Sequence, residues 1–97
     1  MKKKLISIIV TCFNEQDNIE EMYVRVRNVF KKINQYEFEL LYIDNNSTDA
    51  TKAEITKLTR KDKRIKAVFM SRNFGSPQSS FLAGLTYMVG DAAVLLH

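Results

Sequence analysis

The chain has 97 residues and a formal net charge of +4, with 45% hydrophobic and 27% charged residues. This composition is ordinary for a soluble globular chain, and it argues against a disordered protein or more than one domain of usual size. The one cysteine, Cys12, excludes an internal disulfide and fits a reducing compartment. No stretch approaches the ~20 apolar residues of a membrane span, so we expect a soluble, cytoplasmic domain.

The first apolar run, residues 5–10, is rich in β-branched side chains and predicts a strand covered on both faces. Asn14 is a candidate N-cap for the following helix, and Asp17 is favourable in its first turn. From residue 19 to residue 33, apolar side chains recur every three or four positions. This spacing predicts an amphipathic helix with one buried stripe.

The second and third apolar runs, residues 38–43 and 65–70, predict two further strands. Between them, the polar segment 47–49 favours a helix start. Residues 52–66 are strongly basic, and a basic stripe can attract nucleic acid or an anionic lipid surface. No aromatic residue interrupts this run to provide a stacking platform. We therefore expect a solvated helix face and no nucleic-acid binding.

The last part of the chain predicts a third helix and a fourth strand. Ser76 and Pro77 suit the helix start, and Gly90 suits a left-handed cap at its end. We expect four apolar side chains to form the buried face of this helix: Phe81, Leu82, Leu85 and Val89. The run at 92–96 predicts a strand with an exposed edge, which favours self-association. Because the chain stops there, we expect the front part of a larger domain.

The predicted order is β-α-β-α-β-α-β, which defines an α/β protein with a mostly parallel open sheet and right-handed helical crossovers. Three polar clusters directly follow the first three strands. They are residues 11–15 (TCFNE), 44–49 (DNNSTD) and 71–75 (SRNFG). Ligands of such sheets bind outside the carboxyl ends of the strands. We therefore expect the three clusters to form one polar site.

The first two clusters suit a nucleotide. The carboxylate of Asp44 can accept hydrogen bonds from the ring N–H groups of a base. Phe13 can stack on the base, Thr11 can hydrogen-bond to it, and Glu15 can accept from a ribose hydroxyl. Simpler roles stay open: Asp44 caps the next helix, Asn45 builds a turn, Phe13 packs in the core and Glu15 is a favourable charge at a helix start.

The third cluster offers Arg72, whose guanidinium fork suits a phosphate, and Asn73, which allows tight backbone near a ligand. The alternative is a surface arginine in an ordinary turn. Cys12 is a poor nucleophile, because the one histidine, His97, lies at the far end of the chain. The chain has no Gly-x-Gly-x-x-Gly, no Walker loop and no metal spacing of cysteines and histidines. This counts against a dehydrogenase, a P-loop enzyme and a structural zinc site.

Four segments, in this order and register, resemble the start of family 2 glycosyltransferases of the GT-A fold. They are SIIVTCFNEQDNI, ELLYIDNNSTDAT, SRNFG followed by FLAGL, and GDAAVLL. The resemblance covers nearly the whole chain and is greatest to polyprenyl-phosphate sugar transferases of the dolichyl-phosphate mannose synthase and bactoprenol glucosyltransferase type. It implies a Rossmann-like nucleotide-binding half of a glycosyltransferase domain, truncated before or within the D-x-D motif and inactive alone.

The resemblance also implies a UDP- or GDP-sugar donor, with a divalent Mg or Mn ion in the full-length enzyme. The acceptor it implies is a polyprenyl phosphate or a growing polysaccharide, at the cytoplasmic face of the membrane. Matched positions place seven residues around the donor: Thr11, Phe13, Glu15, Asp44, Asn45, Arg72 and Asn73. None of these is matched to a catalytic or metal-binding position.

Several positions depart from the family pattern. Thr11 stands where a proline is usual, and Phe13 where a tyrosine is usual, which removes a hydroxyl group. Asn45 replaces the second acid of an Asp-Asp pair, so we expect an altered base pocket. His97 falls where the first aspartate of D-x-D would be.

Two other classes of protein fit parts of the pattern. One is a stand-alone nucleotide-binding or interaction module without catalysis, whose exposed last strand recruits a partner. The other is a flavodoxin-like or receiver-like domain. Receiver chemistry needs paired acids at the strand ends, and the sequence offers only Asp44 and Glu15 there.

Overall fold

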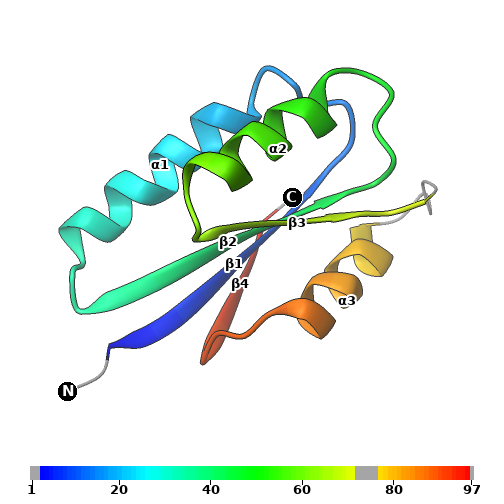
Figure 1. Ribbon diagram of the computed structural model, residues 1–97. Coiled ribbons are helices and arrows are strands. Elements are labelled where there is room, and N and C mark those ends of the chain that lie inside the picture. The colour runs from blue at the N-terminus through cyan, green and yellow to red at the C-terminus, as the bar shows by residue number, and fades with distance from the viewer. Residues whose placement is uncertain (1–2, 72–76, 97) are drawn as a thin grey trace.

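The structure is a computed structural model that describes residues 3–71 and 77–96, with the backbone alone for residues 77–81. Along these residues strands and helices alternate in the predicted order (Figure 1). The elements are β1 (Lys4–Cys12), α1 (Ile19–Lys32), β2 (Tyr36–Asp44), α2 (Thr51–Lys61), β3 (Ile65–Phe69), α3 (Pro77–Tyr87) and β4 (Ala92–Leu96). No helix among these residues is long and apolar enough to cross a bilayer.

The strands form one sheet in the order β3-β2-β1-β4, and every neighbouring pair is parallel. The α/β class and the parallel sheet are therefore confirmed. β1 and β2 pair along their whole length, from Lys4 opposite Tyr36 to Cys12 opposite Asp44. Both strands are longer than predicted and run directly into their polar clusters. This pairing brings the first two clusters side by side.

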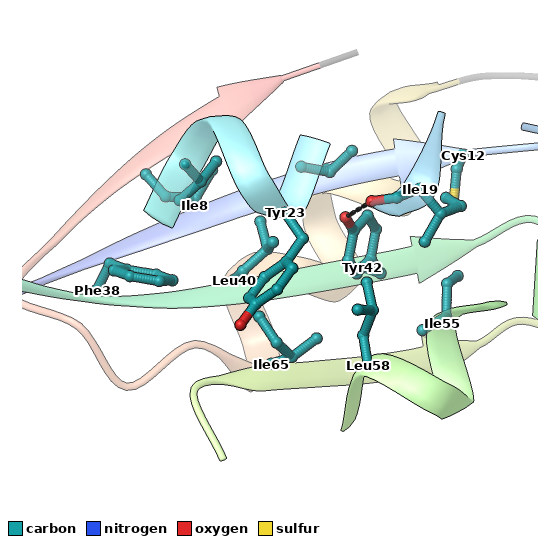
Figure 2. Close-up of a cluster of buried hydrophobic side chains, with 12 residues drawn as sticks. Ile8, Cys12, Ile19, Tyr23, Phe38, Leu40, Tyr42, Ile55, Leu58 and Ile65 are labelled. Atoms are coloured by element: carbon teal, nitrogen blue, oxygen red, sulfur yellow. Dashed lines mark hydrogen bonds between the residues drawn. The ribbon is translucent and has the colours of Figure 1, made fainter. Parts of the chain in front are cut away.

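The helices cover both faces of the sheet: α1 and α2 lie on one face, and α3 lies on the other (Figure 1). The core under α1 and α2 is the larger one, and Figure 2 shows its side chains from β1, β2, β3 and both helices. At its centre, the fully buried Tyr42 donates a hydrogen bond of 2.7 Å to the carbonyl oxygen of Ile19. Ile9, Leu41 and Ile43 point to the other face and form the smaller core under α3.

The start of α1 differs from the prediction. The helix begins at Ile19 with Asn18 as N-cap residue, so the assignment of Asn14 as helix cap is wrong. Asn14 instead has a left-handed backbone, with φ of 52°, and turns the chain. Its side-chain oxygen accepts hydrogen bonds from the backbone N–H groups of Thr48 (2.8 Å) and Asp49 (3.3 Å). The side chain therefore serves the neighbouring loop and not its own helix.

The buried face predicted for α3 is also wrong. Leu82 is 65% exposed and Val89 is 65% exposed, and Leu85 is exposed as well, while the side chain of Phe81 lies outside the described residues. Gly84 faces the sheet instead, and a Cβ atom there would lie 2.4 Å from Cγ2 of Ile9. The helix approaches β1 so closely that its smallest residue must lie at the contact.

The turn from α3 to β4 is tied to the sheet by buried polar groups. The Glu39 carboxylate on β2 accepts a hydrogen bond from the Ser7 hydroxyl and another from the Val89 N–H (2.7 Å), and it forms an ion pair with Lys66 (2.8 Å). The Ser7 hydroxyl accepts from the Gly90 N–H at 2.9 Å. We call these residues the Glu39 clamp: Ser7, Glu39, Lys66, Val89 and Gly90.

Gly90 does not have the predicted left-handed backbone. Its φ lies outside that region, and a Cβ atom there would meet the Ser7 hydroxyl oxygen at 2.2 Å. The glycine is required by close approach to β1 and not by a helix cap. Nearby, the Asp91 carboxylate accepts from the Leu5 N–H at 2.9 Å, and the Asp91 N–H donates back to the Leu5 carbonyl at 2.7 Å.

Candidate functional site

A pocket of about 600 Å³ opens where β1 and β2 end and α1 begins. Its lining contains four of the residues predicted from the sequence to surround a nucleotide: Thr11, Phe13, Glu15 and Asn45. The N-cap residue Asn18 and the first half of α1 complete the wall, the helix contributing Ile19, Glu21, Met22 and Arg25. The structure therefore brings the first two polar clusters together at the carboxyl edge of the sheet.

Phe13 is the exposed aromatic ring of this pocket. It follows the last residue of β1 and is 42% exposed, so the alternative that it packs in the core is wrong. Thr11 and Asn45 are buried beside it, and the Asn45 N–H donates to the Cys12 carbonyl at 2.9 Å. That bond continues the pairing of β1 and β2 by one step and fixes Asn45 at the pocket wall. The pocket thus combines an exposed ring with polar groups on a rigid base.

Asp44 is placed differently from the other candidates. It is fully buried and does not line the pocket. Its carboxylate accepts hydrogen bonds from both the backbone N–H (3.0 Å) and the hydroxyl of Ser47. In this structure Asp44 therefore organises the turn after β2. It does not cap α2, whose N-cap residue is Ala50, so the helix-cap alternative is wrong. Direct contact between Asp44 and a nucleotide stays a prediction.

Hydrogen bonds between the first two clusters join them into one layer of loops. The Asn14 N–H donates to the Ser47 hydroxyl at 2.9 Å, and the Glu15 N–H donates to the Thr51 hydroxyl at 2.8 Å. The Ala50 N–H donates to the side-chain oxygen of Gln16 at 2.9 Å. Sequence reasoning did not assign these linking roles. The sequence feature that could have indicated them is the run of short polar side chains after both strands. Such side chains form hydrogen bonds with the backbone N–H and C=O groups of loops.

Glu15 lies at the pocket in front of α1. Its side chain accepts a hydrogen bond of 2.8 Å from the Asn18 side-chain amide, and its carbonyl accepts 2.9 Å from the Asn18 N–H. The carboxylate is exposed and stands three residues before the N-cap position. Its position fits both interpretations from the sequence, a favourable charge near the helix start and an acceptor for a ligand hydroxyl.

Cys12 lines the pocket but is buried. Burial raises the pKa of its thiol to about 12, and the carboxylates of Asp44, Glu15 and Asp49 contribute to the increase. Because a thiolate is the reactive form, the protonated Cys12 is unsuited to nucleophilic chemistry at neutral pH. Its sulfur instead lies 3.6 Å from the Ile43 carbonyl oxygen, as a weak donor.

Arg72 and Asn73 lie outside the described residues, so their place near the donor stays a prediction. Within the described ranges, 3–71 and 77–96, no group of three histidine, cysteine or carboxylate side chains is arranged to hold a metal ion. The described part of the site can offer a ligand an aromatic ring, hydroxyl and amide groups and a carboxylate.

A parallel sheet with this strand order and a pocket at its carboxyl edge defines a Rossmann-like α/β domain. The sequence model of glycosyl transferase family 2 matches residues 7–97. The chain therefore belongs to glycosyl transferase family 2, as the four sequence segments predicted.

The chain is 34% identical over 96 residues to the putative glycosyltransferase CsbB of Bacillus subtilis (strain 168). This match covers 99% of this chain and 29% of that protein. It is 37% identical over 89 residues to the bactoprenol glucosyl transferase of Shigella phage SfX, covering 92% of this chain and 28% of that one. The chain thus spans less than a third of the length of these relatives.

Two solved structures share the fold. Residues 1–349 of TarS from S. aureus match with a TM-score of 0.76 and 26% identity, over 98% of this chain and 27% of that one. The mannosyltransferase PcManGT from Pyrobaculum calidifontis, in complex with GDP-Man and Mn²⁺, matches with a TM-score of 0.75 and 18% identity, over 94% of this chain and 26% of that one. These similarities confirm the predicted fold class.

Proposed function

We propose that this chain is the nucleotide-sugar-binding part of a glycosyltransferase, which transfers a sugar from a nucleotide-diphosphate donor to an acceptor. One observation carries the proposal: Thr11, Phe13, Glu15 and Asn45 line one pocket at the carboxyl edge of a parallel sheet. Ligands of open α/β sheets bind at this edge. Membership of glycosyl transferase family 2 supplies the reaction class.

Within this pocket, we assign base stacking to the exposed ring of Phe13 and hydrogen bonds to Thr11 and Asn45. Glu15 accepts from a ribose hydroxyl, and Asp44 acts mainly by holding the loop that carries Asn45. The donor is a UDP- or GDP-sugar. The PcManGT structure contains GDP-Man, which supports a GDP-sugar, and the link to this chain is the shared fold alone.

The acceptor we propose is a polyprenyl phosphate, which the similarity to the bactoprenol glucosyl transferase of phage SfX supports. An anionic phosphate is already a nucleophile, so it needs no strong general base from the protein. Such an acceptor would place the complete enzyme at the cytoplasmic face of a membrane. We assign a divalent metal to none of the described residues, because they contain no group of three suitable ligands.

The direct test is titration with UDP, GDP and CDP, comparing Phe13→Ala with Phe69→Ala. Phe69 ends β3, is 45% exposed and does not line the pocket, so it is a matched control. Stacking of a base on an aromatic side chain contributes about 1–3 kcal/mol. We therefore expect Phe13→Ala to weaken nucleotide binding at least about fivefold, and Phe69→Ala to leave it unchanged. Equal effects of the two changes would refute the assigned site.

A second test separates catalysis from binding. The 97-residue chain should bind nucleotide without transferring sugar, and addition of a polyprenyl phosphate should yield no glycosylated lipid. Sugar transfer by this chain alone would show that it contains more of the catalytic machinery than we assign to it. Absence of any nucleotide binding would favour the alternative of an interaction module.

A further inference from the structure

A second pocket, of about 460 Å³, lies at the opposite edge of the sheet. It is formed where β1 and β2 begin, by the last turns of α1 and by Arg64, which directly precedes β3. It shares no lining residue with the pocket proposed for the nucleotide. A ligand bound here would be far from the donor along the strands.

The lining is strongly basic. Lys3, Arg27, Lys31 and Arg64 contribute four positive charges, against one carboxylate from Glu37. Arg64 is already engaged, because its guanidinium forms two bonds to Asp62, at 3.0 and 2.7 Å. Among the residues that the structure describes, Lys3, Arg27 and Lys31 form no ion pair.

Arg27 offers the pocket a buried hydrogen-bond donor. The Nε atom of Arg27 is buried, and no acceptor among the described residues bonds to it. The guanidinium carbon lies 5.2 Å from the centre of the Tyr23 ring, so a cation–π contact orients the group. A buried donor without a partner is costly, and an anion in the pocket would satisfy it.

Aromatic side chains form the apolar part of the same pocket. The rings of Phe30 and Phe38 lie with centroids 4.9 Å apart, and Tyr36 is 38% exposed beside them. The Arg64 guanidinium carbon stacks over the Phe38 ring, 4.3 Å from its centre. A purely inorganic anion would use only the basic half of this lining.

We propose that this pocket is a second ligand site that binds a phosphate ester with an aromatic or similarly apolar body. The phosphate interacts with Arg27, Lys3 and Lys31, because a doubly charged group needs several cations and an arginine fork matches its oxygens. The apolar body packs against Phe30 and Tyr36. The site does not depend on the proposed donor pocket.

The test follows amide NMR shifts of the 97-residue chain during titration with phenyl phosphate and, separately, with inorganic phosphate. We expect phenyl phosphate to bind more tightly and to shift the amide signals of Arg27, Phe30 and Tyr36. Shifts confined to Phe13 and Asn45, or equal affinity for the two probes, would overturn the proposal.

Two variants and one control complete the test. Arg27→Gln should weaken phenyl phosphate binding about tenfold, since hydrogen bonds to charged groups are the strong ones. Arg60→Gln removes the same charge from an exposed position on α2 and should leave the affinity within about twofold, as expected for a screened surface charge. If Arg27→Gln does not fold, the exposed Lys31→Gln replaces it. Equal losses in the variant and the Arg60→Gln control would show unspecific charge attraction and refute the site.

Discussion

Asp44 and Ser47 show how one residue pair shapes the whole candidate site. The carboxylate is fully buried and accepts both the N–H and the hydroxyl of Ser47. The same hydroxyl accepts the Asn14 N–H from the first polar cluster. A single buried acid therefore holds the turn after β2 and, through Ser47, the loop after β1.

We expect Asp44→Ala to lower the free energy of unfolding by about 1–3 kcal/mol, because two buried donors of Ser47 lose their acceptor. Urea denaturation measures this loss. Ser47→Ala is the matched variant: it keeps the carboxylate and its bond to the backbone N–H, but it removes the acceptor of the Asn14 N–H. Asn14 is exposed, so water can replace that acceptor, and we expect Ser47→Ala to cost less than Asp44→Ala. Asp44→Ala should also weaken nucleotide binding, and an unchanged affinity would remove Asp44 from the donor site.

At the scale of elements, the packing of α3 depends on one contact. Gly84 meets Ile9 of β1 so closely that a Cβ atom would overlap the Cγ2 atom of Ile9. The helix is apolar on both sides, and Leu82 and Leu85 are exposed on its outer side. The spacing of large apolar residues therefore predicted that a helix forms here, but it did not predict which side of the helix faces the sheet. The close approach of Gly84 to Ile9 decides that orientation.

Gly84→Ala should destabilise the protein. Overpacking costs about 1–3 kcal/mol, which exceeds the ~1 kcal/mol that alanine gains over glycine in a helix. Urea denaturation measures the change in unfolding free energy. In an Ile9→Ala background the overlapping atoms are absent, so the added Cβ should cost nothing there. A cost that persists in that background would show that the Ile9 contact is not the cause.

The Glu39 clamp is the second contact between elements that we consider, and it holds the turn that leads into β4. Burial of the Glu39 carboxyl opposes its ionisation, but hydrogen bonds from Lys66, Ser7 and the Val89 N–H outweigh this and hold its pKa below the ordinary 4.5. A carboxyl whose pKa is lowered by folding stabilises the protein above its unfolded pKa. That contribution is lost as the pH falls through the folded value.

We therefore expect Glu39→Gln to cost about 1–3 kcal/mol of unfolding free energy near pH 7, because hydrogen bonds to a buried charge are lost. The difference from the unchanged protein should shrink as the pH falls below 4.5. Denaturation curves at several pH values measure it. Glu37→Gln, an exposed neighbour on the same strand, is the control and should show little effect at any pH. A pH-independent cost at Glu39 would contradict the ionised clamp.

Much of the element order could be predicted because apolar runs and polar clusters alternate so regularly. The clamp could not, since Ser7 and Glu39 are polar residues within apolar runs, and their partners Val89 and Gly90 follow far along the chain. One sequence feature could have indicated the clamp: Glu39 is an acidic residue in a strand that was predicted to be buried, so its carboxylate needs partners. The start of α1 was missed for a similar reason, because Asn14 bonds to a loop 34 residues away.

At the scale of the whole molecule, the sheet separates two different surfaces. Its carboxyl edge carries the pocket with Phe13 and Asn45, and its amino edge carries the basic pocket with Arg27. The carboxyl-edge site was predictable because parallel strands bring their ends together. The basic pocket was not, because its residues come from three separate segments with no common pattern.

The exposed side of β4 is the third surface. β4 is an edge strand of the described sheet, and Val94 and Leu95 are 43% and 47% exposed. We expect the chain to self-associate through this strand at high concentration, because an edge strand offers unpaired backbone groups. Size-exclusion chromatography over a range of concentrations measures this. Leu95→Lys should restore the monomer, and a monomer at every concentration would contradict strand-edge association.

The pairing of β1 with β2 has a consequence for local unfolding. These two strands are central in the sheet and end with Thr11, Cys12 and Asp44, and Asn45 directly follows β2. Hydrogen exchange is slowest in such buried central strands, and opening free energies are smaller where fewer apolar contacts are buried. We therefore expect α3 and β4, where Leu82, Leu85, Val94 and Leu95 are exposed, to open at a lower free energy than β1 and β2, once the Glu39 clamp is released. A ligand that contacts only the carboxyl-edge pocket would then stay bound in the partly opened molecule, and it would not stabilise α3 and β4. Slower exchange of α3 on nucleotide binding would instead support the predicted contacts of Arg72 and Asn73.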